Sequence, residues 1–209
     1  MSGSIIDRVV SVPFFWNVVQ NALGYPKEKE ALYRSAVDGG GRLLDFGCAS
    51  GHLGQAFVGM DYVGLDVSAS CIAQAKKRWS DQPGMRWVCA NVFDRPFREG
   101  EFDQVLVGCT AHHLSDSNFR PILQELAFFL RPNGRIHIFD PVYQKTDGFA
   151  PRVLRKLDRG KYTRDLDQLI AAVRATAVFQ IEYTATFPAP ASLWRDCDTG
   201  YIRAARAPQ

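Results

Sequence analysis

The stretch of sequence best suited to ligand chemistry places an acid and three glycines at the end of an apolar segment. It runs DFGCASGHLG, from Asp45 to Gly54, directly after Leu43 and Leu44. Glycines let backbone amides approach a ligand closely, and a helix beginning near Gly51 would point its positive end at the same space. These residue types at this spacing favour the binding of a carboxylate or a phosphate.

The glycine spacing argues against two common phosphate sites. A dinucleotide-binding loop has the form G-x-G-x-x-G, whereas Gly47, Gly51 and Gly54 give G-x-x-x-G-x-x-G. A P-loop requires Lys followed by Ser or Thr after its glycines, and here His52 and Leu53 follow Gly51. A dehydrogenase stays an alternative for the fold, with nicotinamide binding as its test and the glycine spacing against it.

Two adjacent histidines, His112 and His113, are candidates for a general base because they follow the apolar segment 102–108. An imidazole titrates near neutral pH, as a base acting on a hydroxyl or phenol requires. The alternative is a histidine packed structurally beneath its loop. His52 is expected at a solvated helix start, and His137 is expected in a buried strand with hydrogen-bonded ring nitrogens. Since no Cys and His cluster has zinc spacing, no metal site is predicted.

A scaffold must bring these residues together, and predicted strands and helices alternate along the chain. Strands are predicted at 41–46, 61–66, 85–90, 102–108, 134–140, 178–184 and 199–207. Helices are predicted at 27–38, 51–59, 69–79, 121–130 and 164–175, with Ser68 as an N-cap, residues 115–118 as further caps and a turn at 131–134.

This alternation predicts an α/β fold, a Rossmann-like, doubly wound, seven-stranded and mainly parallel sheet with helices on both faces. In such sheets ligands bind beyond the carboxyl ends of the strands. The glycine loop, Asp66, Asn91, the two histidines and Asp140 all come just after predicted strands. We therefore expect them at one edge of the sheet.

The glycine loop resembles motif I of the class I S-adenosylmethionine-dependent methyltransferases, Asp/Glu-x-Gly-x-Gly-x-Gly, with Ala49 in place of the middle glycine. Over about residues 41–141, further segments resemble that family in the same order, namely VGLD ending at Asp66, ANVFDRPF (90–97), FDQVLVGCTAHHL (102–114) and LRPNGRIHIFDP (130–141). The resemblance implies S-adenosylmethionine as the cofactor and methyl transfer as the activity.

The resemblance also implies which residues meet the cofactor. Asp66 matches the acid that the family uses on the ribose hydroxyls, and Asn91 stands where an Asp commonly contacts the adenine amino group. The implied cofactor-binding residues are Asp45, Gly47, Cys48, Ala49, Ser50, Gly51, Asp66, Val67, Asn91, Val92 and Cys109. The alternatives are an ordinary helix-entry acid at Asp66 and an ordinary turn residue at Asn91.

The predicted organisation is an N-terminal helical cap over 1–40, then an S-adenosylmethionine-binding domain over 41–209 with an insertion at 142–164. The aromatic residues 14–16 of the cap are expected to close over the cofactor, or alternatively to touch a membrane surface, although a basic face is lacking. The basic run 152–165 is either a lid that contacts an anionic acceptor or a solvated helix face.

The composition limits the kinds of partner that we expect for this protein. The 209 residues suit one domain, and a net charge of +3 is too small to indicate nucleic acid. Five scattered cysteines favour a reduced, cytoplasmic setting, and no apolar run has the length of a membrane span. We expect a small-molecule acceptor. A non-catalytic cofactor-binding protein of regulation or assembly and an RNA or protein methyltransferase are the alternatives, and the oligomeric state stays open.

Overall fold

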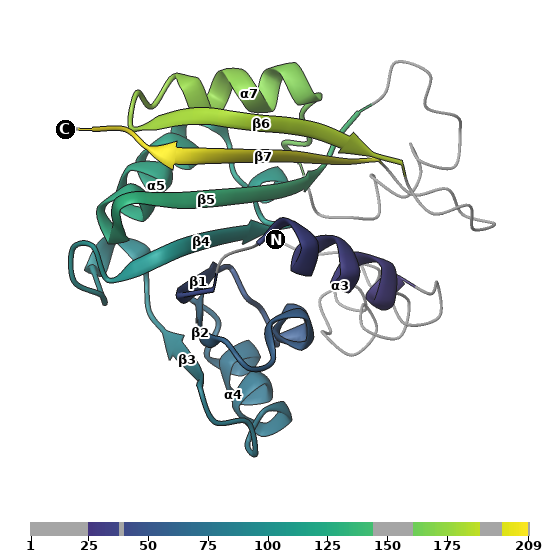
Figure 1. Ribbon diagram of the computed structural model, residues 1–209, viewed down its shortest axis with the longest axis vertical. Coiled ribbons are helices and arrows are strands. Elements are labelled where there is room, and N and C mark those ends of the chain that lie inside the picture. The colour runs from purple at the N-terminus through teal and green to yellow at the C-terminus, as the bar shows by residue number, and fades with distance from the viewer. Residues whose placement is uncertain (1–24, 38–39, 144–160, 189–197, 209) are drawn as a thin grey trace, which may run out of the picture.

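The structure is a computed structural model that describes residues 25–37, 40–143, 161–188 and 198–208. Its centre is a seven-stranded sheet in the order β3-β2-β1-β4-β5-β7-β6 (Figure 1). The strands are β1 (Arg42–Phe46), β2 (Asp61–Asp66), β3 (Met85–Cys89), β4 (Phe102–Gly108), β5 (Leu130–Pro141), β6 (Phe179–Phe187) and β7 (Thr199–Arg206). The first five are parallel, and β7 pairs antiparallel with both β5 and β6. The predicted Rossmann-like fold is confirmed.

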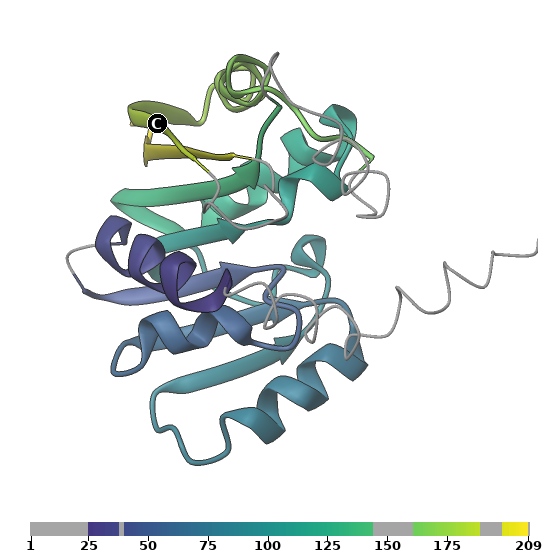
Figure 2. The same cartoon turned by 90° about the vertical axis from the view of Figure 1, so that its right-hand side faces the viewer.

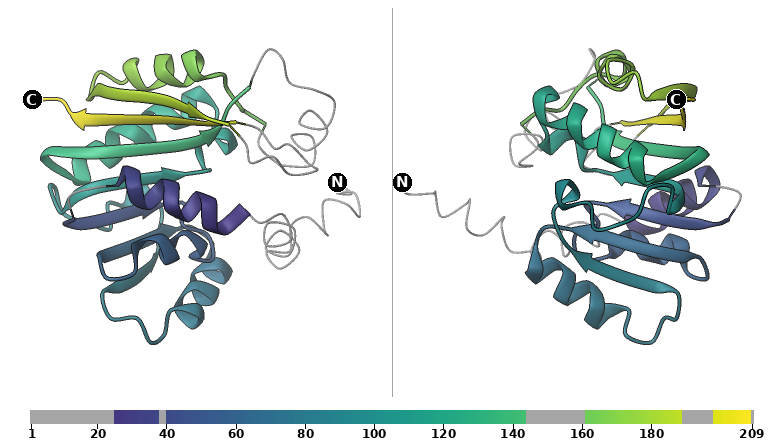
Figure 3. Two further views of the ribbon diagram at one scale, coloured as in Figure 1. Left: turned by 45° about the vertical axis from the view of Figure 1, so that its right-hand side comes forward. Right: turned by 90° about the vertical axis from the view of Figure 1, so that its left-hand side faces the viewer.

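Helices cover both faces of this sheet (Figures 2 and 3). One face carries α3 (Tyr25–Ala36), the 3-10 helix η1 (His52–Phe57) and α4 (Ala69–Arg78). The other carries α5 (Asp116–Phe129), α7 (Leu166–Arg174) and the short turns η2 (Val92–Asp94) and η3 (Ala111–His113). Successive strand residues point to opposite faces, so Leu43 packs in the apolar core on the face that carries α3 and α4, and Leu44 packs in the core on the face that carries α5 and α7.

Local signals explain where two of the helices begin. The Ser68 side chain accepts the amide of Cys71 at 3.3 Å at the start of α4, which confirms the predicted N-cap. Asp165 and Gln168 form a capping box at the start of α7. Such caps are each worth about 0.5–2 kcal/mol of helix stability.

Two predicted boundaries are wrong by four or more residues, at the starts of α5 and β5. The helix α5 begins at Asp116 rather than at Pro121, which lies inside it without an amide hydrogen to donate. The turn predicted at 131–134 falls within β5, because Leu130 pairs with Phe102 and Arg135 with Gln104, leaving four residues opposite one. Because β4 pairs with β5 on both sides of these four residues, β5 continues past them.

The topology gives one position where a ligand is expected. From the adjacent strands β1 and β4 the sheet grows in opposite directions, toward β3 on one side and β6 on the other. Sheets of this kind bind ligands at the carboxyl ends of the two strands where the order reverses. The glycine loop follows β1 and the two histidines follow β4, so both predicted groups lie there.

Several predictions fall outside the described residues, among them the aromatic cap residues 14–16 and most of the basic run 152–165. The division into a cap and a cofactor-binding domain therefore stays a prediction. Among the helices that the structure describes, none has both the length and the apolar character needed to cross a bilayer.

Candidate functional site

The loop between β1 and η1, residues 47–51, folds back against the end of β2. The amides of Gly47 and Cys48 both donate to the carbonyl of Leu65, at 2.8 and 3.2 Å. Positive φ values recur at every second position, +73° at Gly47, +46° at Ala49 and +73° at Gly51. Ala49 is exposed, whereas Cys48 and Ser50 are buried, so the loop presents Ala49 outward and packs its neighbouring side chains inward.

Two of the glycines are required by space as well as by conformation. A Cβ at Gly47 would lie 2.6 Å from Oγ1 of Thr110, in the segment after β4. A Cβ at Gly51 would lie 2.6 Å from Cη2 of Trp87 on β3. The loop is therefore held closely between β3 and the end of β4, as a backbone cradle for a ligand requires.

Asp66, the last residue of β2, ties the loop to the next helix. Its Oδ2 accepts the amide of Ala49 at 2.9 Å, and its Oδ1 accepts the amide of Ser68 at 2.8 Å. Each carboxylate oxygen can accept a second hydrogen bond. Asp66 is partly exposed, so it keeps the capacity to accept the two hydroxyls of a sugar.

Asp45 lies beneath the same loop and is 1% exposed. Its Oδ2 accepts the hydroxyl of Tyr62, whereas its Oδ1 has no hydrogen-bond partner among the described residues. Burial raises the pKa of Asp45 to about 7, the Tyr62 hydrogen bond opposes that rise, and the charge of Asp66 adds to it. A buried acceptor without a donor costs about 1–3 kcal/mol, which an incoming ammonium group would recover.

The end of β3 also lies beside Asp66, because the amide of Ala90 donates to the Asp66 carbonyl at 3.2 Å. Asn91 is exposed, and its Oδ1 accepts the Phe93 amide at 3.1 Å. Val92 is buried in the core, whereas Val67 is 70% exposed. Asp66, Asn91 and Val67 thus share the carboxyl edge, and Val92 supports it from below.

Cys109, the first residue after β4, has the left-handed φ of +51°. Its amide donates to the carbonyl of Phe139 at 2.7 Å, and its thiol lies 3.6 Å from the hydroxyl of Tyr33. Tyr33 is fully buried, and burial followed by the neighbouring Cys109 raises the pKa of its hydroxyl well above the usual value. Tyr33 on α3 gave no sequence signal, because its position depends on how the helix packs.

The structure separates the two histidines that the sequence paired. His112 is 2% exposed, and its Nδ1 lies 2.8 Å from Oδ1 of the equally buried Asp140 at the end of β5. The His113 side chain is exposed, with its ring centroid 4.0 Å from that of His112. A buried carboxylate partner orients one ring, and that ring packs against the exposed one.

Arg164 is a residue whose role the sequence did not indicate. It was predicted within either a lid or a solvated face, but it is 6% exposed. Its guanidinium donates to the carbonyls of Ala111 and Leu114 at 3.0 and 2.8 Å and to Oδ1 of Asp116 at 2.6 Å. Neither alternative holds for Arg164, because these acceptors fix it beneath the histidine-bearing segment.

The other two histidines lie outside this group. His137 is fully buried, with Nδ1 at 3.0 Å from the Tyr201 hydroxyl and Nε2 at 2.9 Å from Gln104 Oε1, which confirms the prediction of a hydrogen-bonded core residue. Partial burial, followed by the nearby charge of Arg78, lowers the pKa of His52 to about 4. His52 is therefore neutral at pH 7.

No metal centre accompanies these groups in the part of the chain that the structure describes, where no three His, Cys, Asp or Glu side chains are placed to hold an ion. The buried oxygen of Asp45 and the accessible lone pairs of Asp66 instead fit a ligand with an ammonium group at one end and a sugar diol farther along. S-adenosylmethionine has both groups.

The strand order defines the class of fold, a Rossmann-like sheet with its candidate site at the carboxyl ends of β1 and β4. Residues 43–134 match the family described as "Methyltransferase domain". Over 109 residues the chain is 36% identical to 2-phytyl-1,4-naphtoquinone methyltransferase of Nostoc sp. strain PCC 7120, covering 48% of this chain and 47% of that protein. The chain thus spans about half the length of the curated relatives that it matches.

Solved structures share the fold over most of the chain. YcgJ of Bacillus subtilis has a TM-score of 0.69 at 17% identity, with 87% of this chain and 99% of that chain covered. Burkholderia thailandensis 1,6-didemethyltoxoflavin-N1-methyltransferase, solved with bound 1,6-didemethyltoxoflavin and S-adenosylhomocysteine, has a TM-score of 0.71 at 19% identity. Coverage is 98% of this chain and 88% of that one.

Proposed function

We propose that this protein is an S-adenosylmethionine-dependent methyltransferase that acts on a small-molecule acceptor. The observation that carries the proposal is the joining of the glycine loop to Asp66 through the Ala49 amide, at the edge where such sheets bind ligands. The methyltransferase match over residues 43–134 supports it, because the match contains both groups.

The cofactor is held by backbone and carboxylates in this proposal. Asp66 accepts the ribose hydroxyls, Asp45 meets the ammonium group of the amino-acid tail, and Asn91 contacts the adenine. The remaining contacts come from the loop and the neighbouring strand ends, at Gly47, Cys48, Ala49, Ser50, Gly51, Val67, Val92 and Cys109. When bound, S-adenosylmethionine supplies an electrophilic methyl group attached to a positively charged sulfur.

The chain's own task is then mainly positioning. Holding donor and acceptor in line can lower a barrier by about 7–11 kcal/mol. We assign the general base to the histidine pair. His113 meets the acceptor because its side chain is exposed, and buried His112, oriented by Asp140, supports it through ring contact. A base placed in this way adds about 10²–10⁴-fold for a hydroxyl or phenol acceptor.

Calorimetric titration of the full chain with S-adenosylhomocysteine tests cofactor binding. We expect Asp66→Asn to weaken binding by about 30-fold, because two charge-assisted hydrogen bonds are lost. Asp81→Asn, an exposed change of equal charge, serves as the control and should leave binding unchanged. Failure of the unaltered chain to bind either S-adenosylmethionine or its demethylated product contradicts the proposal.

Transfer of labelled methyl from S-adenosylmethionine tests catalysis. The first acceptors to assay are 1,4-naphthoquinols, the reduced dihydroxy form of the compound class in the name of one relative, because the quinone itself has no nucleophilic atom to take the methyl group. His113→Gln should lower turnover of a hydroxyl acceptor while leaving S-adenosylhomocysteine affinity unchanged. If both His112→Gln and His113→Gln keep full turnover, the pair does not act as the base.

A non-catalytic cofactor-binding protein and an RNA or protein methyltransferase are the competing functions, since a fold by itself does not fix the reaction. Binding of S-adenosylmethionine without methyl transfer to any compound of a metabolite extract favours a non-catalytic protein. Methyl transfer to macromolecules favours an RNA or protein methyltransferase. We also infer a cytoplasmic location, which the lack of a disulfide among the four described cysteines supports. Cell fractionation checks this location.

A further inference from the structure

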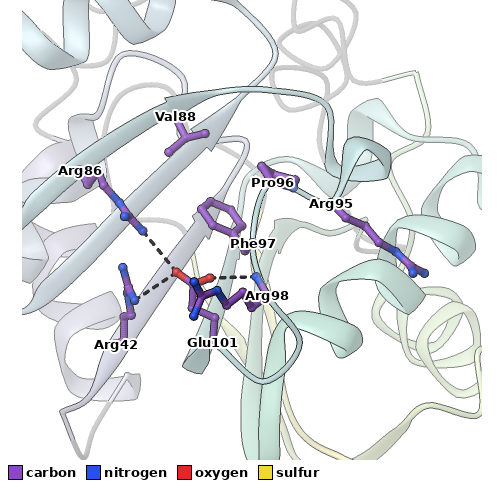
Figure 4. Close-up of a pocket in the computed structure, with 8 residues that line it drawn as sticks. All are labelled: Arg42, Arg86, Val88, Arg95, Pro96, Phe97, Arg98 and Glu101. Atoms are coloured by element: carbon purple, nitrogen blue, oxygen red, sulfur yellow. Dashed lines mark hydrogen bonds and ion pairs between the residues drawn. The ribbon is translucent and has the colours of Figure 1, made fainter.

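A pocket of about 590 Å³ lies at the amino end of the sheet, away from the cofactor edge (Figure 4). It is lined by Arg42, Arg86, Val88, Arg95, Pro96, Phe97, Arg98 and Glu101. Residues 90–101, which connect β3 to β4, contain only the short turn η2 and no α-helix. This part of the sheet therefore stays open where a crossover helix would otherwise cover it.

One carboxylate stands among three guanidinium groups in this pocket. Oε1 of Glu101 lies 3.1 Å from Nη1 of Arg42 and 3.4 Å from Nη2 of Arg86. Its Oε2 accepts the backbone amide of Arg98 at 2.9 Å, and the Arg98 guanidinium forms no ion pair with a residue that the structure describes. Asp61 adds a second carboxylate, 3.5 Å from Nε of Arg42. Positive charge is thus in excess.

Arg95 does not add to this excess. Its Nε lies 2.7 Å from Oε2 of Glu125 on α5, and Figure 4 shows its side chain pointing away from Glu101. The binding groups are therefore Arg42, Arg86 and Arg98. Arginine guanidinium groups match the planar oxygens of carboxylates and phosphates in a bidentate geometry.

The pocket is rigid as well as positive. The Arg42 guanidinium lies 5.3 Å from the centroid of the Phe102 ring. Phe97 packs edge-on against Phe102 at 5.0 Å and against Phe129 at 5.5 Å. Since Val88 and Phe97 belong to the apolar core, the floor is fixed before any ligand arrives.

We propose that this pocket binds a small organic anion, a phosphate or carboxylate carried on an aromatic or apolar group. The guanidinium groups take the anionic end, and Val88, Pro96 and Phe97 take the apolar part. The volume is within the range of small-molecule sites, about 300–1,000 Å³. Arg42 and the glycine loop lie at opposite ends of β1, about 13 Å apart along the strand, so the two sites bind independently.

Titration calorimetry with phenyl phosphate tests the proposal, with and without saturating S-adenosylhomocysteine. We expect inorganic phosphate to bind more weakly than phenyl phosphate, and benzyl alcohol not to bind. Arg86→Gln and Arg98→Gln should each weaken phenyl phosphate binding by about tenfold. Glu101→Gln should strengthen it severalfold, because the competing carboxylate is removed.

Arg174→Gln is the matched control, because Arg174 is an exposed residue of α7 and loses the same charge. It should leave the affinity unchanged. Equal weakening by Arg174→Gln and Arg86→Gln would show a general charge effect and overturn the proposal. So would displacement by S-adenosylhomocysteine, or no binding to the unaltered chain. Circular dichroism checks that each variant folds. If Glu101→Gln does not fold, the phenyl phosphate affinity of Arg98→Gln tests the proposal.

Discussion

The two ends of the sheet differ in how deeply their charged side chains are buried. At the carboxyl end, Asp45, His112, Asp140 and Arg164 are each no more than 6% exposed and meet particular hydrogen-bonding groups. At the amino end some ion pairs are open to water, as between Arg131 and Asp103, whose side chains are 54% and 32% exposed. Buried polar groups are costly when a partner is lost, whereas exposed ion pairs contribute little. Matched substitutions at the two ends should therefore differ strongly.

The largest difference is expected between two glycines with positive φ. Gly51→Val, in the glycine loop, should lower the free energy of unfolding by about 4 kcal/mol, because it adds a clash with Trp87 to backbone strain. Gly59→Val, before β2, meets nothing within 4 Å and should cost only the strain, about 1–2 kcal/mol. Urea unfolding measures both, and equal losses would contradict the importance of close packing around the loop.

Arg164→Ala should cost about 3 kcal/mol, because it leaves the Ala111 and Leu114 carbonyls without their donor beneath the histidine-bearing segment. Arg164→Lys should recover part of this, since Lys keeps the charge but cannot reach all the acceptors at once. The measurement is the free energy of unfolding at pH 7. A loss below about 1 kcal/mol for Arg164→Ala would contradict this role.

The pH dependence of stability offers a further test at the carboxyl end, through Asp45. Its pKa is raised from 3.8 to about 7 in the folded chain, so the folded state keeps a proton that the unfolded state releases between these values. Its contribution to stability therefore falls as pH rises from about 4 to 7 and stays low above that range.

Asp45→Asn should remove this fall and make the protein about 2 kcal/mol more stable at pH 8, after the cost of an unpaired amide donor. The same variant should bind S-adenosylmethionine more weakly, because it has no carboxylate for the ammonium group. Urea titrations at pH 4 and pH 8 measure the first effect. A variant with the same pH dependence as the unaltered protein would contradict the assignment of the fall to Asp45.

The smallest effect is expected at the amino end. Arg131→Ala removes the ion pair with Asp103, whose Oδ1 lies 2.5 Å from Nη1 of Arg131. Because the Arg131 side chain is half exposed, the loss should stay below about 1 kcal/mol and shrink further in 1 M salt. A loss comparable to that of Arg164→Ala would remove the contrast between the two ends.

Local patterns predicted much of this molecule. The strands β2 and β4 begin and end where the sequence placed them, and Ser68 caps α4 as expected. Apolar runs and capping residues act over a few positions, so the neighbouring sequence is enough to specify them. The start of α5 was missed because Pro121 suggested a first turn but lies inside the helix.

By itself, the sequence determined the order of strands and helices, and it put the glycine loop, Asp66 and the two histidines just after strand ends, because these features depend on nearby residues. Only the tertiary structure decided that His112 is buried against Asp140, 28 residues away, while His113 is exposed. It also carried Arg164 to the Ala111 carbonyl, 53 residues away, and raised the pKa of Asp45 by burial. The burial and partners of a charge are set by groups that only folding brings together, and no local pattern records them.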